Sequence, residues 1–239
     1  DHYESIFILQ YEDFIMKILI DISHPAHVHF FKNTIPVFLE KRHEVLTASR
    51  DKDITIPLLD LFNIKHITLS KSPTKKSITA FTKEFFIHCK NLYSLCKVFK
   101  PNVMLQIAGV FIAPVGYLTR CPSVIFYDTE FAKLSNLISY SLASYVCTPD
   151  CYENNIRGNH IRYPGYHELS YLHPDIFKPN PNILAENNLR YNEKFFIVRF
   201  VGWAALHDYN EKGFNFEDKL KLVKILSKYR SEERRVGKE

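Results

Sequence analysis

Three histidines follow a short apolar segment near the start of the chain and are suited to acid–base chemistry. The segment Lys17–Ile22 contains Asp21, and His24, His27 and His29 follow its end. Histidine titrates at a pKa of about 6.5 when unperturbed, so it can accept and release protons near neutral pH. Any single histidine here serves equally well as a helix cap or a polar core residue. We therefore expect a site from the cluster as a whole.

A second polar cluster and a glycine follow later apolar segments. Gly109 comes two residues after Val103–Ile107, and Asp128, Thr129 and Glu130 come directly after the next apolar segment. Gly109 fits either a simple helix N-cap or a backbone position where a helix N-terminus meets an anion. Capping alone would explain Asp128 or Thr129. It explains Glu130 less well, because the first turn does not need it for the cap.

These residues depend on an alternation of predicted strands and helices. The apolar segments predict strands at 17–22, 44–47, 65–69, 103–107, 123–127, 145–148 and 159–163, and helices between them at 28–39, 54–62, 78–99, 110–118 and 131–143. This order predicts an α/β fold, a Rossmann-like parallel sheet with helices on both faces. Ligands of such sheets bind at the carboxyl ends of the strands, where both clusters are expected. The Walker and dinucleotide glycine patterns are absent.

Composition changes divide the chain into five expected segments. Residues 16–170 form the Rossmann-like domain, and the proline-rich and asparagine-rich residues 171–190 form a linker. Residues 191–230 begin a truncated second α/β domain, with a strand at 194–201 and a helix at 217–229. We expect residues 1–15 to be a non-native extension before Met16, and residues 231–239 to be an artefactual tail.

Composition also narrows the class of protein. The net charge of +5 is mild and the basic residues are spread out, so nucleic acid is not expected as a partner. Five cysteines without a repeated CxxC argue against a disulfide framework or a zinc site, and we expect no metal or cofactor. A cytoplasmic location is expected. The basic loop at 70–77 leaves peripheral contact with the inner face of a membrane open, with a solvated surface as the default.

Five segments of the chain resemble a family of bacterial and archaeal proteins known as a domain of unknown function and predicted to be glycosyltransferases of the GT-B fold. The segments are MKILIDISHPAHVHFFK at 16–32, EV at 44–45, FYDTEFAKLSN at 126–136, RYPGYHELSYLHPDIFKP at 162–179 and VRFVGWAALHD at 198–208. The family commonly has a glycine before the His-Glu-Val segment, where this chain has Arg42. More distantly, the chain is similar to the N-acetylglucosaminyltransferase that forms lipid II and to UDP-N-acetylglucosamine 2-epimerases.

The resemblance implies transfer of a sugar from a nucleotide sugar, UDP-linked, to a hydroxyl of a glycan or lipid-linked acceptor in surface polysaccharide synthesis. It places the loops after the first, fourth and fifth strands on the acceptor side. His27 is the expected base, and Asp128 and Glu130 orient it or hold acceptor hydroxyls. The residues assigned to substrate binding are Asp21, His24, His29, Gly109, Thr129, Arg199, Trp203, His207 and Asp208. The last four fit interdomain packing equally well.

Two other functions stay open. A nucleotide-sugar 2-epimerase would use paired carboxylates and histidines to move a proton beside the anomeric carbon, and it would need no acceptor. A non-catalytic module would keep the fold and bind nucleotide sugar without turnover. Because the resemblance places the donor mainly on the second domain, which this chain barely begins, we expect this fragment to be inactive.

Overall fold

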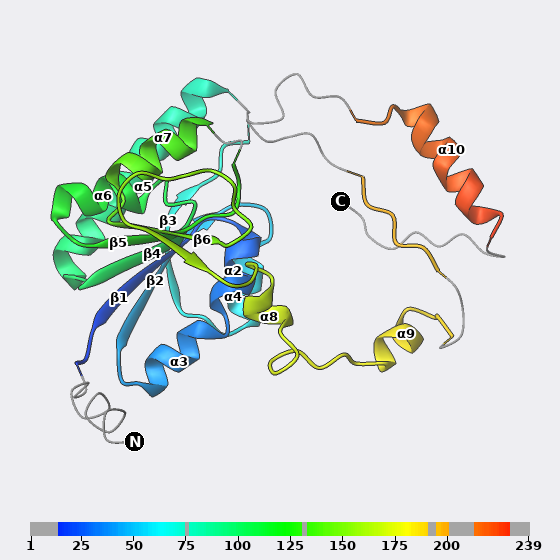
Figure 1. Cartoon of the computed structure of the whole chain (residues 1–239), viewed down its shortest axis with the longest axis horizontal. Helices are drawn as coiled ribbons and strands as arrows, with labels where there is room; N and C mark the ends of the chain where they lie inside the picture. Colours follow the sequence, from blue (N-terminus) through cyan, green and yellow to red (C-terminus); the bar gives the residue numbers. More distant parts are fainter. Residues whose placement is uncertain (1–13, 75–76, 131–132, 191–194, 201–212, 230–239) are drawn as a thin grey trace. The chain divides into compact units, whose positions relative to one another are not determined.

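The alternating segments form a parallel sheet covered by helices in the computed structural model (Figure 1). The structure describes residues 14–74, 77–130, 133–190, 195–200 and 213–229. The chain divides into two units, one ending at Phe177 and the other beginning at Lys178. All seven strands of the sheet lie in the first unit.

The sheet has the strand order β3-β2-β1-β4-β5-β6-β7, and each neighbouring pair is parallel. The strands are β1 (Lys17–Ile22), β2 (Glu44–Asp51), β3 (His66–Lys71), β4 (Val103–Ile107), β5 (Ser123–Phe126), β6 (Tyr145–Pro149) and β7 (His160–Tyr163). This is the order of a doubly wound sheet. From β1 the chain first adds strands on one side, β2 and β3, and then on the other side, from β4 to β7, so the strand order reverses between β1 and β4. The prediction of a Rossmann-like parallel α/β sheet is therefore confirmed.

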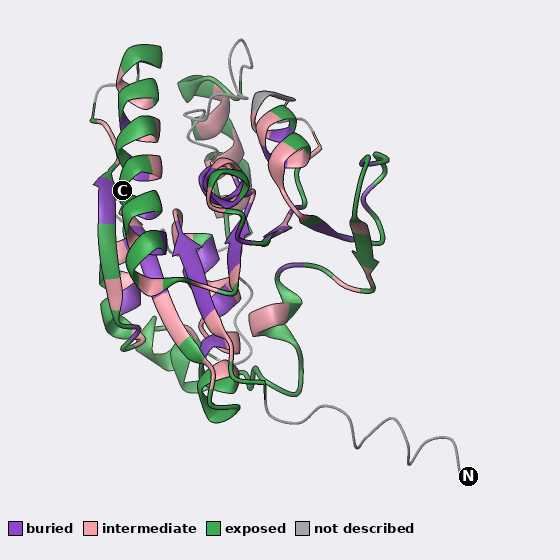
Figure 2. Cartoon of the chain, turned by 90° about the vertical axis from the view of Figure 1, so that its left-hand side faces the viewer, coloured by how far each residue is buried: buried purple, intermediate pink, exposed green. Residues whose placement is uncertain are grey.

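Helices cover both faces of this sheet, and a separate apolar core lies on each face (Figure 2). One core is closed by α2 (Pro25–Phe31), α3 (Thr34–Glu40) and α4 (Thr55–Leu61), and the other by α5 (Ile78–Phe99), α6 (Ile112–Thr119) and α7 (Lys133–Leu142). A short helix, α8 (Leu169–Leu172), follows β7. Alternation along β1 sends Ile18, Ile20 and Ile22 into the first core and Leu19 into the second.

The predicted helix at 28–39 is wrong in one respect, because the structure has two helices there. α2 ends at Phe31 and α3 begins at Thr34. Pro36 explains the break: it has no N–H to donate to the carbonyl of Lys32, and its ring would clash with that carbonyl. The first helix also starts earlier than predicted, with Pro25 in its first turn and His24 as its N-cap.

Two predicted boundaries also differ from the structure. β2 continues to Asp51, beyond the predicted end at residue 47, because its pairing with β3 resumes after an irregularity between Ser49 and Arg50. In the second unit, residues 195–200 form no strand, although a strand was predicted at 194–201. A strand needs a neighbour to pair its backbone groups, and the described part of that unit offers only the helices α9 (Asn182–Glu186) and α10 (Phe216–Ser227).

A chain of polar side chains is buried between α5 and the sheet. Asp21 is fully buried on β1, and both its oxygens lie 3.1–3.2 Å from Nε2 of His88 on α5. The Nδ1 atom of His88 lies 2.8 Å from the hydroxyl of Ser70, which donates to Glu84 at 3.1 Å. Glu84 in turn accepts two hydrogen bonds from the guanidinium of Arg50.

The hydrogen-bond directions in this polar chain favour alternating charges. Ser70 has one hydroxyl proton, which goes to Glu84, so the bond between Ser70 and His88 needs a proton on Nδ1 of His88. Asp21 as a carboxylate needs a second proton on Nε2. An imidazolium at His88 supplies both. Negative, positive, negative and positive groups then follow one another from Asp21 to Arg50.

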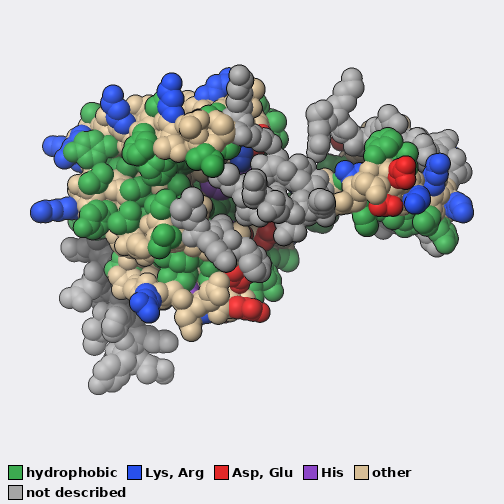
Figure 3. All heavy atoms as spheres, turned by 90° about the horizontal axis from the view of Figure 1, so that it is seen from above, with side chains coloured by type: hydrophobic (Ala, Val, Ile, Leu, Met, Phe, Trp, Pro, Cys, Tyr) green, Lys and Arg blue, Asp and Glu red, His purple; other side chains and the backbone are tan. Residues whose placement is uncertain are grey.

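The outer surface of the first unit mixes apolar and basic side chains. On the face shown in Figure 3, lysine and arginine are scattered and apolar side chains lie between them. None of the helices in the described part of the chain combines the length and the apolar composition needed to cross a bilayer.

His88→Ala is expected to lower the free energy of unfolding by about 3–5 kcal/mol, because it leaves the buried carboxylate of Asp21 without its charged partner. Urea unfolding followed by circular dichroism measures the loss. Val98→Ala is the matched control, because Val98 lies on the exposed face of α5, and it should change stability by no more than about 0.5 kcal/mol. A similar small loss for both variants would show that the polar chain does not stabilise the fold.

Candidate functional site

The sheet brings several of the predicted polar residues to one edge. His24 and His27 follow β1, Gly109 follows β4 and Asp128 follows β5, so all four lie at the carboxyl ends of neighbouring strands. β1 and β4 flank the point where the strand order reverses. In doubly wound sheets this is where the crevice for a ligand opens.

His24 and His27 take different local roles. His24 caps α2, and its Nδ1 accepts a hydrogen bond from the backbone N–H of Ala26 at 3.1 Å. His27 is buried, and its Nδ1 accepts from the backbone N–H of Ser23 at 3.4 Å. Burial, followed by the nearby His24 and Lys52, lowers the pKa of His27 to about 3. His27 is therefore neutral at pH 7, with its proton on Nε2.

Two predicted binding residues, Asp21 and His29, have contacts within the fold. Asp21 points under α5, where it belongs to the buried polar chain, because alternation along β1 turns it away from the loop. His29 lies on α2 with its ring against Phe62 and Tyr171, at centroid distances of 5.7 and 5.4 Å. Burial under α5 leaves Asp21 inaccessible to a ligand. His29 is only partly buried, so its assignment to binding stays a prediction.

The loop after β4 is tightly packed. Gly109 has a φ of +72°, and a Cβ at this position would lie 2.2 Å from Cγ2 of Ile125. The backbone N–H groups of Phe111 and Ile112, where α6 begins, point to the side-chain oxygen of Gln106 at 3.3 and 3.4 Å. These amides are already used within the protein. Close packing, more than anion binding, accounts for Gly109.

Asp128 forms a hydrogen bond with a histidine that was not predicted to belong to the site. Its Oδ2 lies 3.1 Å from Nδ1 of His167, in the loop that follows β7. This hydrogen bond holds the pKa of Asp128 below its usual value, against the opposing effect of burial. Thr129 donates to the other carboxylate oxygen at 3.0 Å. Asp128 is thus held from both sides.

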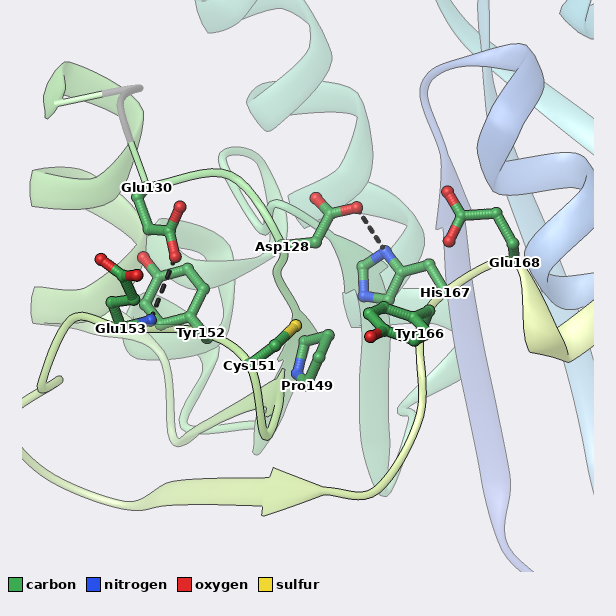
Figure 4. Close-up of a pocket in the computed structure, with 9 residues that line it drawn as sticks. All are labelled: Asp128, Glu130, Pro149, Cys151, Tyr152, Glu153, Tyr166, His167 and Glu168. Carbon is green, nitrogen blue, oxygen red and sulfur yellow. Dashed lines mark hydrogen bonds and ion pairs between the residues drawn. The ribbon is translucent and has the colours of Figure 1, made fainter.

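His167 is oriented by this pair and by aromatic neighbours. Only 8% of its surface is exposed, its ring stacks on Tyr163 and it meets the edge of Phe30. With Nδ1 facing Asp128, the Nε2 atom is buried and has no hydrogen-bond partner within the described residues. Figure 4 shows this nitrogen on the side of the ring that faces Pro149 and Cys151.

A cavity of about 460 Å³ opens beside the Asp128–His167 pair (Figure 4). Its lining residues come from the loops after β5, β6 and β7: Asp128, Glu130, Pro149, Cys151, Tyr152, Glu153, Tyr166, His167 and Glu168. Glu130 accepts a hydrogen bond from the backbone N–H of Glu153 at 3.1 Å, which ties two of these loops together. The described residues contain no cluster of three or more His, Cys, Asp or Glu arranged to hold a metal.

The sequence held a weak signal for His167. The segment Pro164–Glu168 follows the predicted strand at 159–163, as the other polar loops follow their strands. Its approach to Asp128 depends on the pairing of β5, β6 and β7, which no local pattern reveals. Of the second-unit candidates, Arg199 is exposed. Trp203, His207 and Asp208 lie outside the described residues.

Gly109→Ala should destabilise the protein more than Gly158→Ala. Both glycines have positive φ, +72° and +95°, so both variants carry backbone strain, but only Gly109 lies against another side chain. Overpacking on Ile125 should lower the free energy of unfolding by about 2 kcal/mol beyond the loss at Gly158. Urea unfolding of the two variants checks this, and equal losses would contradict it.

Replacing His167 by phenylalanine should raise the pKa of Asp128 toward its ordinary value of about 3.9, because the hydrogen bond to Nδ1 is the main cause of its depression. A depressed pKa means that the pair adds stability above the unfolded-state pKa and loses it as pH falls through the folded-state pKa. Carbon-detected NMR of the Asp128 carboxyl group measures the titration. An unchanged midpoint would argue against the hydrogen bond from His167.

Comparison with known proteins found similar sequences and similar structures. An uncharacterized protein of Methanocaldococcus jannaschii is 26% identical over 141 residues, covering 59% of this chain and 40% of the relative. MurG of Acinetobacter baumannii has a TM-score of 0.52 at 13% identity, covering 63% of this chain and 46% of that one. A UDP-GlcNAc 2-epimerase from Neisseria meningitidis, bound to UDP-GlcNAc, has a TM-score of 0.44 at 12% identity, covering 54% and 40%.

The matched region therefore spans less than half the length of each of these proteins. The likeness to MurG extends to the fold of the sheet and its covering helices. A family match covers residues 16–230, nearly the whole described chain, and confirms the expected resemblance. The chain belongs to the family described as protein of unknown function DUF354.

Proposed function

We propose that this chain is the acceptor-side part of a GT-B-type glycosyltransferase, which moves a sugar from a UDP-linked nucleotide sugar to an acceptor hydroxyl. One observation carries the proposal: the Asp128–His167 pair lines a cavity at the carboxyl edge of a sheet whose fold resembles that of MurG. A carboxylate that orients a histidine, whose other nitrogen has no partner, is an arrangement suited to general base catalysis.

His167 is the base in this mechanism. Asp128 holds the proton of His167 on Nδ1, which leaves the lone pair of Nε2 to accept the proton of the acceptor hydroxyl. The hydroxyl oxygen then bonds to the anomeric carbon. The bond from that carbon to the diphosphate breaks, and its electron pair leaves with the nucleotide. Asp128 stabilises the imidazolium that forms.

Access to Nε2 requires a side chain near it to move, because this atom is closed to solvent. Tyr166 lines the same cavity and is a candidate for this movement. Tyr166 is 60% exposed, so its side chain has room to move. A hydroxyl that reaches Nε2 would also remove the cost of a buried polar atom without a partner, about 1–3 kcal/mol.

The structure favours another role for His27, which was the expected base. A pKa of about 3 makes its imidazole a weak proton acceptor at neutral pH. Its proton on Nε2 instead suits a neutral hydrogen-bond donor to an oxygen of the acceptor or the transferred sugar. Glu130 holds the loop after β6 in place, because its carboxylate accepts a hydrogen bond from the backbone N–H of Glu153.

The donor side belongs to the second domain in this proposal. Arg199 there would neutralise the leaving diphosphate, and Trp203, His207 and Asp208 would contact the nucleotide sugar. The acceptor is a glycan or a lipid-linked glycan of surface polysaccharide synthesis, which places the protein in the cytoplasm or at the inner face of the membrane. No step requires a metal or cofactor.

Epimerisation of a nucleotide sugar is the second candidate. Asp128, Glu130 and His167 line one cavity, and such a set could remove and return a proton at the carbon beside the anomeric centre. The two reactions differ in one requirement. Transfer needs an acceptor, whereas epimerisation changes the nucleotide sugar alone.

Assays of UDP release with a panel of UDP-sugars should show turnover that depends on an added acceptor in the longer Methanocaldococcus jannaschii relative. The same assays test whether this chain, which is expected to be inactive, turns over. Conversion of the UDP-sugar without an acceptor would favour the epimerase, and binding without turnover would favour a non-catalytic module. Failure of both proteins to bind any UDP-sugar would overturn the proposal.

His167→Phe should lower kcat by about 10²–10⁴-fold in the protein that turns over, the usual contribution of a general base. Phenylalanine keeps the ring contacts with Tyr163 and Phe30 and removes both nitrogens. His173→Phe is the control, because His173 is half exposed and outside the cavity. An unchanged kcat in His167→Phe would show that His167 is not the base.

A further inference from the structure

We propose that the cavity beside His167 takes a sugar ring that carries no anionic group, and that it selects against uronic acids and sugar phosphates. The inference rests on the proposed function, because this ring is taken to be the acceptor. The charge, the hydrogen-bonding capacity and the volume of the cavity indicate the chemical class of that acceptor.

Carboxylates dominate the charge of the cavity. Four of its lining residues are acidic, and the described lining residues include no lysine or arginine: the acidic ones are Asp128, Glu130, Glu153 and Glu168. His167 faces one of the four. An anionic ligand would therefore meet several like charges at short range, where Coulomb repulsion is strongest.

The nearby cation Arg162 is already engaged. Its guanidinium donates to the backbone carbonyls of Asp150, Tyr152 and Asn154, in the loop that forms one wall of the cavity. These bonds use three of the five N–H donors of Arg162 and hold the loop in place. Arg162 therefore supports the wall of the cavity, and it is not among the residues that line it.

The same carboxylates suit sugar hydroxyl groups. An ionised carboxylate accepts hydrogen bonds only, and bonds from hydroxyl groups to it are stronger than those between neutral groups. The buried Nε2 of His167 is a further acceptor without a partner, and it points independently to a ligand that donates a hydrogen bond. Tyr152 and Tyr166 add aromatic surface to the lining, which suits the apolar face of a sugar ring.

The size of the cavity is consistent with such a ligand. Its volume of about 460 Å³ lies within the range of small-molecule sites, about 300–1,000 Å³. A sugar ring with one attached group would place hydroxyls between the acidic side chains and His167. The reacting hydroxyl would be the one that meets Nε2.

Three methyl glycosides that differ in one substituent test this selectivity: methyl glucoside, methyl glucosaminide and methyl glucuronide. NMR titration of the chain should show that the neutral and amino sugars bind at least about tenfold more tightly than the glucuronide, because the carboxylates repel the third ligand. The signals of Asp128 and His167 should shift with the first two. Equal or tighter binding of the glucuronide, or binding by none of the three, would overturn the inference.

Two variants show whether the carboxylates cause the selectivity. Replacing Glu153 and Glu168 together by glutamine keeps hydrogen-bonding oxygens and removes two charges, so the preference should fall below about threefold. Glu40→Gln is the matched control, because Glu40 is an exposed glutamate at the end of α3 and does not line the cavity. An undiminished preference in the double variant would overturn the inference.

The inference and the proposed function fail separately. Transfer onto a uronic acid or a sugar phosphate would overturn the inference and leave glycosyl transfer standing. Selective binding of neutral and amino sugars, in a protein that neither binds nor turns over UDP-sugars, would support the selectivity and overturn the proposed function.

Discussion

The buried contact between Asp21 and His88 constrains the rest of the first unit. A carboxylate without solvent must have a charged or hydrogen-bonding partner, and both of these side chains are fully buried. The partner comes from α5, so this helix can pack on the sheet only where His88 reaches β1. Ser70, Glu84 and Arg50 extend the contact to β3 and β2. One set of charges thus fixes a helix against three strands.

Gln106 carries this constraint toward the candidate site. Its amide nitrogen donates to Asp21 at 2.5 Å, and its oxygen accepts from the backbone amides where α6 begins. The same polar chain therefore positions the loop between β4 and α6. Gly109 in that loop packs on Ile125 of β5, whose end leads to Asp128. The position of Asp128, the partner of the candidate base, thus follows step by step from a buried ion pair on the central strand.

The sequence predicts the features that depend on local pattern and misses those that depend on distant partners. β1, β4 and α5 have the predicted bounds, because apolar runs and periodicity are local signals. His88 and Glu84 are different: on an amphipathic helix they are expected on the exposed face, and their burial is explained only by partners on other elements. His167 escaped prediction for the same reason. The break at Pro36 had a local signal.

Buried polar side chains in the first unit differ in whether they have hydrogen-bond partners. Those without a partner lie near the candidate site. In the polar chain under α5, each side chain from Gln106 to Arg50 has a hydrogen-bond partner. The buried side-chain atoms without one, among the described residues, are Asn136 Oδ1, Tyr163 Oη and His167 Nε2. Tyr163 stacks on His167, and Asn136 donates to the backbone of Glu130, so all three atoms belong to residues at or beside the cavity. Unpaired buried groups cost stability and persist where another constraint keeps them. A ligand that donates hydrogen bonds at this edge of the sheet would supply that constraint.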